Sequence, residues 1–252
     1  SRFAQVVGDR ARKLAQEASA ANVSAPGPQT GITLEPLSPT IEGDTVSYRF
    51  VTLHIDRAHR TAHLTLRGPG ADQAVKSADA LHALASRGEL WALRAFRELD
   101  DAICRLRFHE ATIGLVMVST RGARADVLAA DAALYAQRGY WLGREVLLQM
   151  ARVLRRMDMT AKSFFAVADP ESCYAGSMLE LLLASDRSYV LDSPDVQFAT
   201  DVLNAGSLLA ANGQTRLALR SHDRPERVSS PTYTVCMVHR GPIGMVHVDL
   251  FR

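Results

Sequence analysis

Two short, continuously apolar runs constrain most strongly how this chain can fold. They are TIGLVMVST (112–120) and SFFAVAD (163–169), and each has the length of a strand buried on both faces rather than that of a helix. The segments 72–107 and 127–156 carry apolar residues at helical spacing instead. Strands that alternate with helices in this way indicate an α/β fold with largely parallel strand pairing.

The two ends of the chain depart from this pattern. Residues 1–21 predict an amphipathic helix, and residues 22–45 are rich in Pro, Gly, Ser and Thr, which is typical of a linker. A linker at this place implies that the helix belongs to something that precedes the main domain, which we place at 46–227. Residues 228–252 have a strand-like composition, but no pattern connects them to the rest.

The main domain is expected to open with a β-hairpin. Residues 48–56 and 61–68 alternate apolar and polar side chains around a charged turn. His54, His59 and His63 fall in this hairpin, but their spacings do not converge on one face. We therefore expect no metal site from them.

The composition is that of an ordinary globular protein, with 47% apolar and 22% charged residues. No run of 18 apolar residues supports a membrane span and the polar N-terminus does not resemble a signal peptide, so we expect a cytoplasmic protein. Cys104, Cys173 and Cys236 stand far apart, which argues against a disulfide framework and a structural zinc site. A net charge of +2 without a basic stripe argues against nucleic-acid binding.

The loop ESCYAGSM (171–178) lies between a predicted strand and a predicted helix. Backbone N–H groups at a helix start are unpaired and attract negative charge, and Gly176 allows a close approach to the backbone. An oxyanion hole is therefore physically reasonable here. The alternative is that Gly176 and Ser177 form only a turn and a helix cap. The sequence around Ser177 lacks the second glycine of a nucleophile elbow, which argues against a serine nucleophile. Cys173 is interpreted as a packed thiol.

Glu180 lies on the otherwise apolar helix LELLLA, one turn after this loop. A carboxylate among leucines is unusual unless it faces a cavity, where burial would raise its pKa toward general acid or base use. The alternative is an exposed glutamate on a helix surface. His109, Trp91 and Trp141 are interpreted as packing residues of helix faces.

The sequence AGSMLELLLASD resembles the crotonase signature Gly-Gly-Gly-x-Glu-Leu-Ala-x-x-x-Asp. A closer resemblance, over about residues 3–227, is to the C-terminal crotonase-like half of the benzoyl-CoA-dihydrodiol lyase family. It is carried by YRFVTLHIDRAHRTAHLTLRGP, LRAFRELDDAICRLR, ESCYAGSMLELLLASDRSY and ANGQTRLALR. The resemblance implies a crotonase-like ββα spiral that is incomplete at the C-terminus. It also implies that residues 1–21 correspond to the last helix of a preceding crotonase-like domain.

Matching the family's motifs assigns candidate site residues. The backbone N–H groups of Ala129 and Ser177 would form the oxyanion hole for the thioester oxygen, and Glu180 would be the first catalytic glutamate. Gly176 would lie near the site. The second glutamate position holds Val202, which cannot transfer a proton. Asp201 is one position off and is expected to point in another direction.

The resemblance implies part of an enzyme that opens the ring of 2,3-epoxybenzoyl-CoA with water during aerobic benzoate degradation. The products would be 3,4-dehydroadipyl-CoA semialdehyde and formate. No metal or redox cofactor would be needed, since coenzyme A is part of the substrate. The expected partners are a CoA-thioester substrate and either further copies of the chain or a companion crotonase-like half. Two alternatives remain, a non-catalytic structural repeat and an enoyl-CoA hydratase or isomerase, and Val202 counts against the second.

Overall fold

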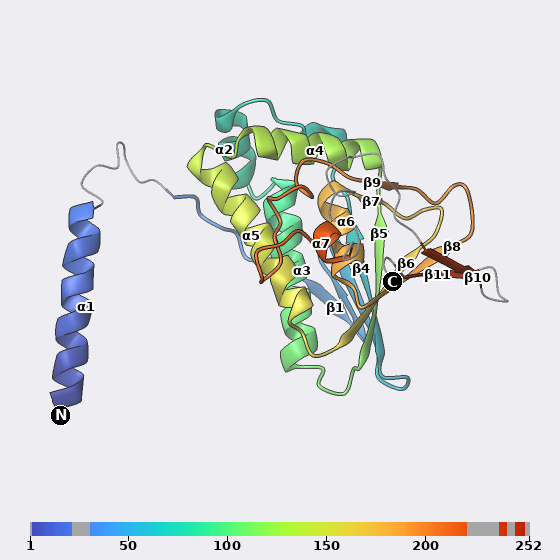
Figure 1. Ribbon diagram of the computed structural model, residues 1–252, viewed down its shortest axis with the longest axis horizontal. Coiled ribbons are helices and arrows are strands. Elements are labelled where there is room, and N and C mark those ends of the chain that lie inside the picture. Colours follow the sequence, from blue (N-terminus) through green and yellow to red (C-terminus); the bar gives the residue numbers. More distant parts are fainter. Residues whose placement is uncertain (1, 22–30, 221–236, 241–244, 250–252) are drawn as a thin grey trace. The chain divides into compact units, whose positions relative to one another are not determined.

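The computed structural model describes residues 2–21, 31–220, 237–240 and 245–249 (Figure 1). The chain divides into two compact units, Ser1–Thr33 and Leu34–Arg252. The first unit contains α1 (Arg2–Ala21), which confirms the helix predicted at 1–21. Arg12 with Asp9 and Lys13 with Glu17 form ion pairs one helical turn apart on its surface.

The second unit is built on a nine-stranded sheet with the order β1-β2-β3-β4-β5-β6-β8-β11-β10. Neighbours from β1 to β4 pair antiparallel, and β4, β5, β6 and β8 pair in parallel. Together with the helices between these strands, this confirms the α/β prediction. The strands are β1 (Thr40–Glu42), β2 (Thr45–Ser47), β3 (Val51–Asp56), β4 (Thr61–Arg67), β5 (Leu115–Arg121), β6 (Ser163–Ala168), β8 (Arg187–Leu191), β10 (Met237–Arg240) and β11 (Met245–Asp249).

Helices pack on one side of this sheet, where α3, α5 and α6 gather in Figure 1. Their apolar residues recur every three to four positions, so that Phe96, Leu99 and Ile103 of α3 are all buried. The helical elements are η2 (Ala71–Gln73), α2 (Ala78–Ser86), α3 (Trp91–Phe108), α4 (Arg124–Ala136), α5 (Trp141–Asp158), α6 (Gly176–Ala184) and α7 (Arg216–Arg220). Among the described residues, no helix is both long and apolar enough to cross a membrane.

The strands β5 and β6 form where the two apolar runs predicted them, but only one of their faces is fully buried. Val116 and Val118 of β5 lie beneath the helices, whereas Leu115 and Met117 on the opposite face are half-buried. The prediction that both faces are buried is therefore wrong for the described part of the chain. An apolar run shows that a strand avoids water, but it does not show how much each face is covered.

The predicted linker extends too far at its C-terminal end. β1 and β2 form a hairpin through Gly43, whose φ is +56°, and the second compact unit already begins at Leu34. β-branched residues on both sides of the Glu42-Gly43-Asp44 turn explain the strands. Arg94 and Arg97 of α3 donate hydrogen bonds to the carbonyl groups of Leu37 and Glu35, which hold this segment against the domain.

The predicted tail at 228–252 lies partly outside the described residues. Within the described part, β10 and β11 pair with each other, β11 pairs antiparallel with β8, and β10 is the last strand of the sheet.

Candidate functional site

Gly176 stands where the loop predicted to hold an oxyanion hole becomes helix α6. β7 (Tyr174–Ala175) pairs in parallel with β9 (Phe198–Ala199) and leads directly into this residue. Its φ of +49° is a left-handed conformation that favours glycine. A Cβ at this position would overlap Asp131 Oδ2 and lie 2.9 Å from Asp201 Oδ2. The predicted close approach to Gly176 is therefore present, but two side chains of the chain itself make it.

Ser177 uses its backbone N–H and its hydroxyl group on Asp131, a residue of α4. The N–H donates to Asp131 Oδ2 at 2.6 Å, and Oγ donates to Oδ1 at 2.9 Å. Both residues are completely buried. The carboxylate stabilises the positive end of α6 as a capping side chain does, although it comes from 46 positions earlier in the chain. The N–H that the resemblance assigns to a thioester oxygen is thus bound to an internal carboxyl group.

Ala129 does not present a free N–H. It is an interior residue of α4, which begins at Arg124. Only the N–H groups of the first turn of a helix lack a partner within the helix. The segment ADVLAADA contains alanine and leucine and no glycine that would interrupt a helix, so α4 continues through the position where the motif match expects an N–H donor. The structure thus brings together Ser177, Gly176 and Asp201, whereas the N–H of Ala129 lies within a helix.

Glu180 is almost fully buried, with 1% of its surface exposed. Oε1 accepts a hydrogen bond from Asn204 Nδ2 at 2.7 Å, and Oε2 accepts one from Arg216 Nη1 at 3.1 Å. Burial raises the pKa of Glu180 to about 7, against the opposing effects of Arg216 and Asn204. The predicted direction of the pKa shift agrees with this environment. However, both carboxylate oxygens are already engaged.

Arg216 carries the ion pairs of this network. Its Nε and Nη2 donate to Asp158 at the end of α5, at 3.0 and 2.5 Å, and Nη1 also donates to the carbonyl of Leu208 at 2.9 Å. Arg216 is 2% exposed, so its charge is balanced by Asp158 and Glu180 rather than by water.

Asn204 connects Glu180 to the Gly176 turn. Besides its bond to Glu180, Nδ2 donates to the carbonyl of Gly176 at 2.9 Å, and Oδ1 accepts from the N–H of Asp201 at 2.9 Å. Sequence reasoning missed both Asn204 and Asp131. Both lie inside segments that the motif match covers, but at positions to which the motifs assign no role, so only spatial contact across distant segments reveals them.

Asp201 points toward Asp131 and the Gly176 turn. Oδ1 accepts from the N–H of Leu203 at 2.8 Å, whereas Oδ2 is buried and receives no donor from the described residues. Burial raises the pKa of Asp201, and burial together with the nearby charge of Asp201 raises that of Asp131 far above its usual range. Val202 stands at the second glutamate position of the family motif, and its side chain is 37% exposed. It therefore does not occupy a buried position like that of Glu180.

The histidine prediction is wrong in one respect. His54 of β3 and His63 of β4 are direct partners in the antiparallel register, which puts their side chains on the same face of the sheet. His54 Nδ1 is paired with Thr45 Oγ1 at 2.9 Å, and His59 in the turn is paired with Asp56. Within the described part of the chain, no group of three or more His, Cys, Asp or Glu side chains is arranged to hold a metal ion.

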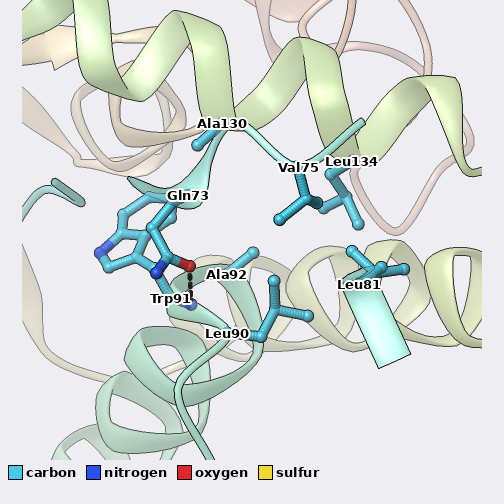
Figure 2. Close-up of a pocket in the computed structure, with 8 residues that line it drawn as sticks. All are labelled: Gln73, Val75, Leu81, Leu90, Trp91, Ala92, Ala130 and Leu134. Carbon is cyan, nitrogen blue, oxygen red and sulfur yellow. Dashed lines mark hydrogen bonds between the residues drawn. The ribbon is translucent and has the colours of Figure 1, made fainter. Parts of the chain in front are cut away.

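A small cavity lies beside Trp91 at the start of α3 (Figure 2). Gln73 Oε1 accepts a hydrogen bond from the N–H of Trp91 at 2.9 Å. The cavity has a volume of about 10 Å³, which is room for about one water molecule and not for a substrate. The buried Trp91 and Cys173, whose pKa burial raises to about 11, fit the packing roles predicted for them.

A comparison with known proteins bears on this site. No family model matches the chain. Benzoyl-CoA-dihydrodiol lyase from Aromatoleum evansii is 34% identical over 231 residues, which cover 90% of this chain and 40% of that protein. The chain is similar to benzoyl-CoA-dihydrodiol lyase. This confirms the resemblance that the motifs indicated, and the chain spans well under half the length of this lyase.

Solved structures of enoyl-CoA hydratases also resemble the chain, more distantly. An enoyl-CoA hydratase from Geobacillus kaustophilus is 15% identical with a TM-score of 0.46, over 73% of this chain and 60% of that one. An enoyl-CoA hydratase/carnitine racemase from Magnetospirillum magneticum is 17% identical with a TM-score of 0.46, over 75% and 62%.

Proposed function

We propose that this chain is a non-catalytic crotonase-like half of an enzyme that opens the ring of 2,3-epoxybenzoyl-CoA with water. The products would be 3,4-dehydroadipyl-CoA semialdehyde and formate, in aerobic benzoate degradation. The similarity to benzoyl-CoA-dihydrodiol lyase over 90% of the chain supports the enzyme, and the internal contacts of Ser177 and Glu180 support the non-catalytic role. A cytoplasmic location is part of this proposal.

The bond between the Ser177 N–H and Asp131 is the observation that carries the proposal. An oxyanion hole stabilises a transition state only when its donors are free to meet the charge that develops on the substrate oxygen. A thioester oxygen carries a partial charge before reaction, whereas Asp131 offers a carboxyl group held by two donors of the same residue. The internal group therefore competes successfully for this N–H.

Among the residues that the structure describes at this site, none is free to exchange a proton with a substrate either. Glu180 is held between Asn204 and Arg216, and Val202 occupies the second glutamate position of the family motif. Addition of water to a double bond needs acid and base groups within reach of the substrate. This argues against an enoyl-CoA hydratase and supports the proposal that the chemistry of the enzyme lies in a companion crotonase-like half.

Turnover by an assembled enzyme tests whether this chain is non-catalytic and the companion half carries the chemistry. The chain would be combined with the part of the Aromatoleum evansii lyase that it does not match, and Glu180→Gln compared with the unchanged chain. We expect the two halves to associate and turnover to change by less than about twofold, because Glu180 does not meet the substrate. A loss of about a hundredfold with association intact would identify Glu180 as a catalytic acid or base. Failure of the unchanged halves to associate would contradict the supporting role.

A further inference from the structure

We propose that Asp131 and Asp201 form one titratable unit, which holds a single proton between its two carboxyl groups and fastens the segment 198–208 onto α4 and α6. This inference rests on contacts within the domain and does not depend on the proposed function. The two residues lie 70 positions apart in the numbering, and their carboxyl groups meet beside Gly176.

The hydrogen bonds around the pair leave one oxygen without a donor. Asp131 accepts from the N–H and the hydroxyl of Ser177, and Asp201 Oδ1 accepts from the N–H of Leu203. Asp201 Oδ2 is buried, receives no donor from the described residues, and lies in side-chain contact with Asp131. Two ionised carboxylates facing each other away from water would repel strongly, and a shared proton removes that repulsion.

Asp131 accepts two hydrogen bonds from Ser177, and its pKa is raised further than that of Asp201. A proton between Asp131 and Asp201 Oδ2 satisfies the orphaned oxygen, whichever of the two carboxyl groups carries it. Glycine at position 176 makes this arrangement possible, because any Cβ there would occupy the space of the two carboxyl groups.

Other titratable groups surround the pair on the neighbouring elements. Cys173 precedes β7, and its thiol stays protonated because burial raises its pKa to about 11. Glu180 of α6 and Arg216 of α7 connect to the same segment through Asn204. Of these, Glu180 also titrates near neutrality, since its pKa is about 7. An experiment must therefore separate the aspartate pair from Glu180.

The direction of the pH effect follows from the raised pKa values of both aspartates. A folded state that binds an acidic proton more tightly than the unfolded chain is most stable below the ordinary aspartate pKa of about 4. This contribution to stability is lost as pH rises through the folded-state pKa of the pair. At high pH the second ionisation should loosen 198–208 from the two helices.

Two amide substitutions test the proposal because they are expected to act in opposite directions. Asp201→Asn keeps the Oδ1 acceptor for Leu203 and places an N–H donor where the shared proton lies. Its urea unfolding midpoint should exceed that of the unchanged protein at about pH 9 and match it at about pH 5. Asp131→Asn loses one of the acceptors that Ser177 needs, so its midpoint should fall at both pH values. Asp195→Asn, at an exposed aspartate of the preceding loop, should follow the unchanged protein.

Both Asp201→Asn and the unchanged protein retain Glu180, so the effect of its titration on the unfolding midpoint cancels when the two are compared. A midpoint for Asp201→Asn that is lower than that of the unchanged protein at high pH would overturn the proposal. Infrared spectroscopy near pH 7 gives a second measurement that does not depend on stability. The unchanged protein should show the carbonyl stretch of a protonated carboxyl group, reduced in Asp201→Asn but not in Asp195→Asn. Equal bands in all three proteins would show that the pair holds no proton.

Discussion

Gly176 is the residue at which the local geometry of the candidate site is decided. Its left-handed backbone lets the chain pass from β7 into α6, and the absence of a side chain leaves space for the carboxyl groups of Asp131 and Asp201. The sequence indicated that something approaches Gly176 closely, since glycine precedes a helix in a polar loop. It could not indicate what approaches, because Asp131 and Asp201 belong to other elements.

Gly176→Ala is expected to destabilise the protein by at least about 2 kcal/mol. The left-handed conformation alone costs an alanine roughly 1–2 kcal/mol, and the overlap with Asp131 adds the cost of overpacking. Urea denaturation at neutral pH measures the change. Gly206→Ala is the matched control, since a Cβ there meets nothing within 4 Å and its φ is not positive. Equal losses of stability in the two variants would show that the crowding at Gly176 does not contribute to the free energy of unfolding.

At the scale of elements, periodic segments were predictable and the contacts between them were not. The apolar runs at 112–120 and 163–169 predicted β5 and β6, and helical spacing predicted α3 and α5, because burial imposes a period on each element. β1 was missed because a hairpin of three-residue strands is too short to show a period. α4 shows a further limit, since the motif match at Ala129 required a free N–H within what is a continuous helix.

Arg216 joins three elements, since it lies on α7 and binds Asp158 of α5 and Glu180 of α6. Arg216→Met is expected to cost about 3–5 kcal/mol, because it leaves two carboxylates without their buried counter-charge. The free energy of unfolding from urea titration checks this value. Arg144→Met, which removes an exposed pair with Glu145, should change it little. A loss in Arg216→Met no larger than in this control would mean that the network does not hold α7 in place.

At the scale of the whole molecule, the chain carries motifs that resemble the crotonase signature, and the groups at the matched positions 177 and 180 are bound within the chain itself. The crotonase-like signature and the similarity to benzoyl-CoA-dihydrodiol lyase could both be read from the sequence. The proposed closure of the site could not, because it depends on Asp131, Asn204 and Arg216, which contact α6 only after folding. A family motif therefore predicts where a site lies better than it predicts whether the site is open.

Binding of benzoyl-CoA, measured by isothermal titration calorimetry, tests this closure most directly. With the chain by itself and ligand in large excess, we predict no saturable heat, because the Ser177 N–H is bound to Asp131 and Glu180 is bound to Arg216. Coenzyme A without the benzoyl group is the control for contacts that do not involve the thioester. Saturable binding of benzoyl-CoA that coenzyme A does not reproduce would show an open thioester site and contradict the account.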